Sequence, residues 1–184
     1  YFSSVFTHED ITDVPGPRPQ AMPSVLSDIV VTPGMVDRKL MELNGSSAPG
    51  PDGLHPCVLK NIHQALAKPL ATLLQRSLDC GELPQEWTEA RVVSMHRKGD
   101  KQAPSNYRPV SLTAVPCKVL ESVVRDHMMA NLAEHNLLSR HQHGFRPKRS
   151  CASQLLEVLD AWTKEMECGN PVDVTYPDFR KAFD

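Results

Sequence analysis

Apolar residues recur at helical spacing along four stretches of the chain, and this pattern predicts four helices. Pro33 suits the first turn of a helix, and Ser150 is a good capping residue. Pro69 lies inside the second apolar run, where we expect a kink or a break because proline lacks the backbone N–H. The predicted helices cover residues 33–44, 59–78, 115–132 and 150–168.

Three other stretches predict strands, because they contain β-branched residues or alternate between apolar and polar positions. Residues 87–95 and 107–113 flank a polar, basic loop, so they predict a hairpin with a long basic tip. Residues 172–176 predict a further strand after the last helix. Helices and short strands therefore follow one another in mixed order, and we expect an α/β mixed, helix-rich fold.

The first 45 residues have a different composition from the rest. They are rich in Pro, Ser and Asp, and we expect a partly disordered linker with one short helix. Residues 46–53 read SSAPGPDG, which predicts a loop. The second domain is expected to cover residues 46–184.

The cations of the chain are unevenly distributed. The 184 residues carry a formal charge of −2, which argues weakly against nucleic-acid binding. Arginine and lysine nevertheless gather at Arg97–Lys101 and at Arg140–Arg149. Two basic loops can meet a phosphate backbone even when the whole chain is close to neutral.

Cysteine spacing and hydropathy exclude two classes of protein. The five cysteines stand far apart without a CxxC pair, which favours reduced, intracellular thiols over a zinc knuckle or a disulfide framework. We find no run of about 18 apolar residues and no signal peptide, so neither a membrane nor a secretory role is expected.

Asp178 comes just beyond the last predicted strand. A carboxylate at the open end of a rigid strand is well placed to hold a divalent metal ion, and polymerases use such carboxylates to hold two Mg²⁺ ions. A surface aspartate in a turn explains the same spacing. The position alone therefore leaves both interpretations open.

Four segments resemble, in the correct order, motifs of the reverse transcriptases that non-LTR retrotransposons encode (LINE-type, jockey- and chicken-repeat-like elements). They read SSAPGPDGLHPCVLK, then GELPQEW with ARVVSMHRKGD and NYRPVSLTAVPCKVLE, then QHGFRPKRSCASQL, and finally VDVTYPDFRKAFD. The resemblance covers residues 48–184. It implies the fingers and the first palm strand of a right-hand polymerase fold, incomplete at the C-terminus.

The last motif has the usual form VDVVYLDFSKAFD in the family. The resemblance therefore implies that Asp178 is the first aspartate that binds catalytic Mg²⁺. Phe183 falls at the bulky residue that packs under the incoming sugar and rejects a 2′-hydroxyl. Pro177 departs from the family, which has leucine there, and proline removes a backbone donor from a central strand.

The hairpin cations have a role in the same family. A lysine and an arginine of the fingers hairpin clamp the triphosphate there, which implies that Arg97, Lys98 and Arg108 bind the incoming nucleotide. Whether Arg97 or Lys98 occupies the lysine position is open by one residue. A solvated, charged turn is the other interpretation of these two residues.

The segment QHGFRPKRS implies a set of template-binding residues, which are Gln142, Gly144, Phe145, Arg146 and Arg149. Gly144 would let the backbone approach a nucleotide closely, and the arginines could meet its phosphates. Phe145 could pack against a base or could equally fill the core. His141 and His143 are expected to be polar loop residues, because no acid or cysteine completes a metal site at ligand spacing.

The resemblance implies an RNA-directed DNA polymerase that uses an RNA template, a DNA primer and deoxynucleoside triphosphates, and that works in the nucleus and the cytoplasm. The family's paired Asp-Asp motif does not occur in the 184 residues. We therefore expect the chain to be inactive without the missing palm and thumb. An RNA-binding fragment without catalysis and an inert retroelement relic are the alternatives.

Overall fold

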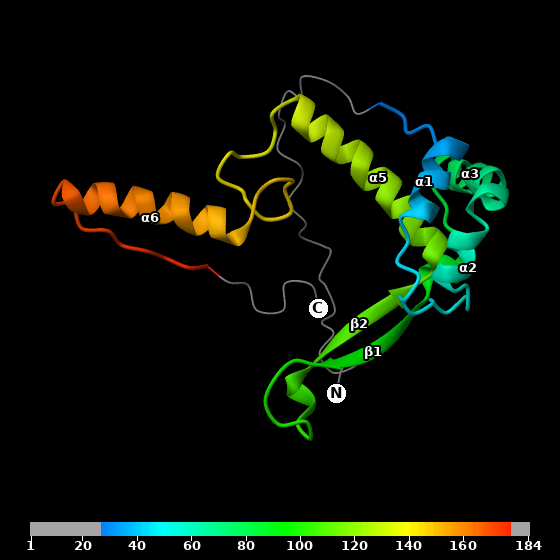
Figure 1. Ribbon diagram of the computed structural model, residues 1–184, viewed down its shortest axis with the longest axis horizontal. Coiled ribbons are helices and arrows are strands. Elements are labelled where there is room, and N and C mark those ends of the chain that lie inside the picture. Colours follow the sequence, from blue (N-terminus) through cyan, green and yellow to red (C-terminus); the bar gives the residue numbers. More distant parts are fainter. Residues whose placement is uncertain (1–26, 178–184) are drawn as a thin grey trace, which may run out of the picture. The chain divides into compact units, whose positions relative to one another are not determined.

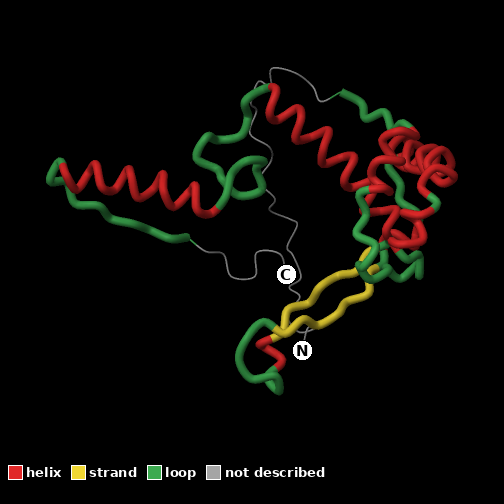
Figure 2. The backbone as a smooth tube through the Cα atoms, in the orientation of Figure 1, coloured by secondary structure: helices red, strands yellow, loops and turns green. Residues whose placement is uncertain are grey.

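The computed structural model describes residues 27–177, which divide after Asn131 into two compact units (Figures 1 and 2). The first unit contains α1 (Pro33–Met41), α2 (Pro56–Asn61), α3 (His63–Cys80), α4 (Gln85–Thr88), β1 (Ala90–His96), β2 (Tyr107–Thr113) and most of α5 (Val115–Glu134). The second unit contains α6 (Cys151–Glu167). Helices together with one two-stranded sheet in the described residues confirm the mixed, helix-rich fold class.

The helix α1 begins where the sequence predicts. The Thr32 side chain caps it by accepting a hydrogen bond from the Met35 amide at 3.3 Å. Val36 and Leu40 lie on one face of the helix, and both are fully buried. With this face α1 packs against α3, so it belongs to the core of the first unit.

The helix α3 runs through Pro69 without a break, and the interruption falls earlier, at Ile62. Ile62 has φ −105° and ψ 18°, and it separates α2 from α3. Proline costs α3 one backbone hydrogen bond, but burial of the neighbouring side chains offsets this loss. These neighbours are Ala67, Leu70, Ala71 and Leu74.

The core of the first unit contains most of the predicted apolar faces of residues 59–78 and 115–132, whereas Ile62, Leu73 and Met128 of these faces are exposed. On α5, Val115, Val119 and Val123 follow one another at a spacing of four residues, and all three are buried. Leu120 of α5 joins them, and side chains from the other helices and loops complete this core, including Val31, Val36, Leu40, Leu59, Leu70, Leu74 and Trp87.

Two ion pairs link α1 to the long helices. Asp37 Oδ1 lies 2.5 Å from His63 Nδ1 of α3, and Lys39 pairs with Asp126 of α5. The hydrogen bond from Lys39, followed by the one from Arg125, lowers the pKa of Asp126. Asp126 is half exposed, so this pair directs the packing of α1 more than it stabilises the fold.

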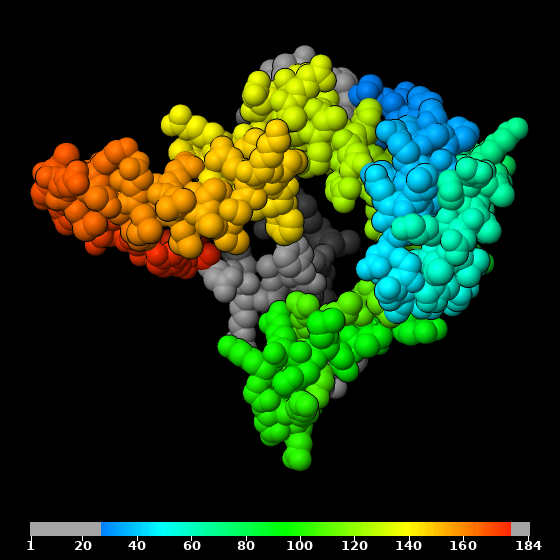
Figure 3. Space-filling model, viewed as in Figure 1, coloured from blue at the N-terminus to red at the C-terminus, as the bar shows by residue number. Residues whose placement is uncertain are grey.

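The strands β1 and β2 form the predicted hairpin. Their antiparallel register runs from Ala90 opposite Thr113 to His96 opposite Tyr107. The strand β1 begins at Ala90, later than predicted, because Trp87 lies in α4 and packs in the core. No residue of β1 is buried, and the hairpin side chains lie at the surface (Figure 3).

The loop that reads PGPDG lies against the junction between β2 and α5. Gly50 is buried, and a Cβ added to it would lie 2.6 Å from the carbonyl oxygen of Thr113 and 2.8 Å from the Cα of Ala114. The loop closes through a hydrogen bond from the Gly53 amide to the Gly50 carbonyl at 3.2 Å, with Gly53 at φ 70°. The Asp52 carboxylate accepts the Leu54 amide at 3.2 Å. The residue types of this loop are therefore those that its backbone requires.

The helix α6 of the second unit begins after Ser150, which confirms the predicted cap. The Ser150 side chain accepts the Ser153 amide, and the Ser153 side chain accepts the Ser150 amide in return. No residue of α6 is buried. The predicted strand at 172–176 is wrong, because none of the described residues pairs with this segment and a strand needs such a partner.

Some predictions are not settled by the fold. Asp178 and Phe183 lie outside the described residues. The right-hand polymerase fold and the domain boundary at residue 45 stay predictions. Within residues 27–177, no helix is both long enough and apolar enough to cross a membrane.

The Gly50 contact predicts a clear effect of substitution. Gly50→Ala should destabilise the first unit by about 1–3 kcal/mol, because the new methyl group meets backbone atoms that cannot rotate away. Gly34→Ala is the matched control. Its Cβ would meet nothing within 4 Å in α1, and it should stabilise the chain by about 0.5–1 kcal/mol. Urea denaturation measures both, and equal stability of the two variants would contradict the account.

Candidate nucleic-acid interface

The hairpin carries its arginines on one face. Directly opposed residues of an antiparallel pair share a face, and Met95 lies opposite Arg108 in the register. Arg91 and Arg97 have the same parity as Met95 along the strand, and the Arg97 amide extends the ladder with a 2.8 Å hydrogen bond to the Asn106 carbonyl. The other face carries no arginine or lysine. The hairpin therefore concentrates fixed positive charge on one side.

The arginines of this face are open to solvent. Arg97, Lys98 and Arg108 are all exposed. The Arg108 guanidinium contacts the Met95 sulfur at 3.4 Å. In the part of the chain that the structure describes, neither Arg97 nor Lys98 forms an ion pair. These charges are thus available to an anionic ligand.

The hairpin tip is ordered by its own polar groups. The Asn106 side-chain amide donates to the Asp100 carbonyl at 2.8 Å, and the Tyr107 hydroxyl donates to the Lys101 carbonyl at 3.0 Å. The Asp100 carboxylate accepts the Gln102 amide at 2.9 Å. Asp100, the acid nearest in sequence to Arg97 and Lys98, therefore forms its hydrogen bond within the turn and not with these cations.

The loop at residues 136–150 presents Phe145 to solvent. Phe145 is fully exposed at a φ of 58°, a backbone conformation that is unfavourable for a residue with a side chain. The interpretation that Phe145 fills the core is therefore wrong. Gln142 and Gly144 are also exposed, and a Cβ on Gly144 would meet nothing within 4 Å.

The two arginines predicted to meet the template make contacts inside this loop and, for Arg149, also with α6. Arg146 donates to the Ser139 carbonyl at 2.8 Å. Arg149 Nη1 lies 3.1 Å from His143 Nε2 and 3.7 Å from the Glu157 carboxylate. Each guanidinium has five N–H groups, so each keeps donors for a further ligand.

His143 is a residue whose role the sequence analysis missed. Its side chain is only 2% exposed, and it contacts the Ser153 hydroxyl at 2.8 Å and the Glu157 carboxylate at 2.9 Å. His141 contacts the other oxygen of Glu157 at 2.8 Å. The hydrogen bond with His141, followed by the one with His143, lowers the pKa of Glu157. No sequence signal marks the contact between His143 and Glu157, because Glu157 lies on α6 and the rest of the loop separates the two residues in sequence.

Metal-ligand geometry is absent from the described part of the chain. No group of three or more His, Cys, Asp or Glu side chains there could hold a metal ion. His141 and His143 use separate oxygens of Glu157 instead of converging on one point. The metal-binding role of Asp178 is thus a prediction that residues 27–177 do not test.

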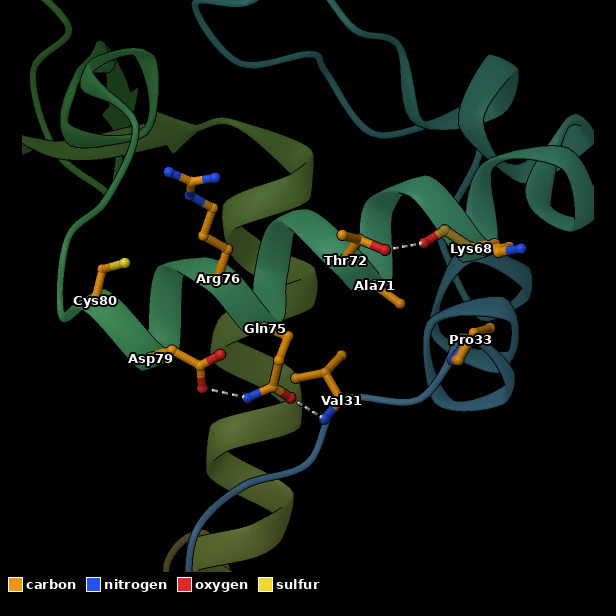
Figure 4. A pocket seen from close by; sticks show the side chains of 9 residues that line it. All are labelled: Val31, Pro33, Lys68, Ala71, Thr72, Gln75, Arg76, Asp79 and Cys80. Carbon is orange, nitrogen blue, oxygen red and sulfur yellow. Dashed lines mark hydrogen bonds between the residues drawn. The ribbon is translucent and has the colours of Figure 1, made fainter.

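An open cavity of about 600 Å³ lies beside α3, at a distance in sequence from both basic loops (Figure 4). Gln75 crosses it, accepting the Val31 amide at 2.7 Å and donating to the Asp79 carboxylate at 2.7 Å. The bond to Val31 attaches the segment before α1 to α3. The cavity contains none of the predicted site residues.

The chain is similar in sequence to proteins of retrotransposable elements. No family model matches the chain. It is 33% identical over 156 residues to a 115 kDa protein of the type-1 retrotransposable element R1DM of Drosophila melanogaster, a match that covers 81% of this chain. It is 26% identical over 142 residues, 74% of the chain, to an RNA-directed DNA polymerase from the Drosophila transposon BS.

The chain is a homologue of non-LTR retrotransposon proteins. A third relative of this kind, an RNA-directed DNA polymerase from the Drosophila X-element, is 22% identical over 83% of the chain. The chain spans 14%, 15% and 17% of the lengths of these three retrotransposon proteins. The homology therefore concerns a small part of each.

Proposed function

We propose that the chain forms the fingers and the start of the palm of an RNA-directed DNA polymerase from a non-LTR retrotransposon. The observation that carries the proposal is the match of most of the chain to relatives that bear this name. The substrates would be an RNA template, a DNA primer and deoxynucleoside triphosphates.

The hairpin supports the proposal through its charge. Arg97 and Arg108 share one exposed face, and fixed positive charge at adjacent positions suits a triphosphate. Lys98 follows Arg97 and starts the turn instead of continuing the ladder. The geometry therefore favours Arg97 over Lys98 as the partner of Arg108 in a triphosphate clamp.

The loop at 136–150 supports template binding by a different route. An exposed aromatic ring offers a stacking surface to an unpaired base, and Phe145 is fully exposed. The exposed Gln142 and Gly144 lie beside it in sequence, and Arg146 and Arg149 retain free donors for phosphate. Phe145 is thus the proposed base contact, and the arginines mainly shape the loop.

Magnesium enters the proposal only through Asp178. Two Mg²⁺ ions would supply charge stabilisation for nucleotidyl transfer in a complete domain. The described residues show no metal cluster, so the ligands would have to include carboxylates outside 27–177. Phe183 would lie beneath the incoming sugar in the same domain.

An RNA-binding role without catalysis is the second candidate. The full exposure of Phe145 in an unfavourable backbone conformation favours it, because such conformations persist mainly at functional sites. Both candidates require the basic residues to meet nucleic acid.

Binding of a single-stranded RNA oligonucleotide should become weaker as salt rises. Arg97→Gln and Arg108→Gln should each reduce the slope of log affinity against log salt by about 0.7, the value for one phosphate contact on a single strand. Arg38→Gln removes the same charge from an exposed position on α1 and should leave the slope unchanged. Fluorescence anisotropy at several salt concentrations measures all three. Equal slopes for the three variants would count against the hairpin as the interface.

The 184-residue polypeptide should not extend a primer. Its sequence contains no Asp-Asp pair, and one carboxylate cannot hold two metal ions in the geometry that nucleotidyl transfer needs. The assay uses a primer annealed to an RNA template, with Mg²⁺ and all four deoxynucleoside triphosphates. Template-dependent synthesis that Asp178→Asn abolishes would overturn this expectation.

A further inference from the structure

The loop at residues 136–150 holds an unfavourable backbone conformation at three positions. Asn136, Phe145 and Lys148 have φ values of 52°, 58° and 60°, and none of them is glycine. Such a loop keeps its shape only if other contacts fix it. Phe145 itself contributes none of these contacts, because its side chain is fully exposed.

His143 provides the buried anchor of this loop. Within the loop it is the buried side chain, and both ring nitrogens have partners on α6. Nδ1 lies 2.8 Å from the Ser153 hydroxyl, and Nε2 lies 2.9 Å from the Glu157 carboxylate. The loop is thus attached to the helix through one imidazole ring.

The ring also touches the cap of α6 and a guanidinium of the loop. The Ser153 hydroxyl donates to the Ser150 carbonyl at 2.8 Å, so the contact with Nδ1 lies at the first turn of the helix. Arg149 Nη1 lies 3.1 Å from Nε2, so this ring nitrogen faces both a carboxylate and a guanidinium.

Glu157 gathers three side chains of the loop. Its carboxylate faces His143, His141 and Arg149. Arg140 contacts His141 from the loop. A single carboxylate on α6 therefore holds the loop at several points, and His143 is the buried one among them.

We propose that His143 and Glu157 form a latch that fixes the 136–150 loop on α6 and so positions Phe145 for an unpaired RNA base. His143 is a positioning residue, since its side chain is only 2% exposed and has almost no surface to offer a ligand. The binding of RNA in this inference rests on the proposed function, whereas the latch itself does not.

Amide hydrogen exchange of the full chain tests the latch without RNA. The Gln142 amide donates to the Ser139 carbonyl and the Arg149 amide to the Arg146 carbonyl, so both report on the loop. His143→Gln should raise their exchange about tenfold after correction for intrinsic rates. His141→Gln is the matched control, because its ring contacts the same carboxylate but is 66% exposed, and it should change exchange little.

Glu157→Gln tests the partner of His143 on α6. It removes the carboxylate but keeps the length of the side chain, so the exchange of these two amides should rise as it does in His143→Gln. Unchanged exchange in either variant would overturn the latch.

RNA binding by the same variants separates the latch from the proposed function. Weaker RNA binding by His143→Gln, about fivefold or more and with His141→Gln unchanged, supports both parts of the inference. Faster loop exchange with unchanged RNA affinity would leave the latch in place and overturn the role of this loop in binding template. Amides in the middle of α6 confirm in each case that the helix remains folded.

Discussion

The first unit depends on the close approach of Gly50 to the backbone of Thr113 and Ala114. At that point a loop from the start of the unit meets the place where the chain leaves β2 and enters α5. Backbone atoms cannot rotate aside as a side chain can, so the two segments approach this closely only with glycine at position 50. The hairpin leaves the helical core from this junction, and its direction follows from it.

The hairpin in turn is built for contact with something other than its own core. An isolated two-stranded hairpin is marginally stable in water, and β1 has no buried residue. Its cations share one exposed face without acidic partners there, which suits the phosphates of a nucleotide or a nucleic acid. Such a surface is what the proposed polymerase function requires of this hairpin.

Periodicity predicted the helices α1, α3 and α5, which each bury one stripe of side chains. The Ser150 cap and the hairpin were predictable from residue type, because serine favours the N-cap and β-branched residues favour strands. The interruption at Ile62 was not, because tertiary packing overrides the local preference at Pro69. The predicted strand at 172–176 required a pairing partner, which alternation alone does not supply. Exposed Phe145 and buried His143 depend on how the loop folds back on α6, and no spacing in the sequence encodes that.

The central claim is that the hairpin tip and the 136–150 loop are the surfaces that meet nucleic acid. Photochemical cross-linking of the chain to a 4-thiouridine-containing RNA, followed by mass spectrometry of the peptides, tests it most directly. The account predicts cross-links in the peptides that contain residues 97–108 and 140–149, with Phe145 among the modified residues. Cross-links confined to α1, α2 and α3 would contradict it.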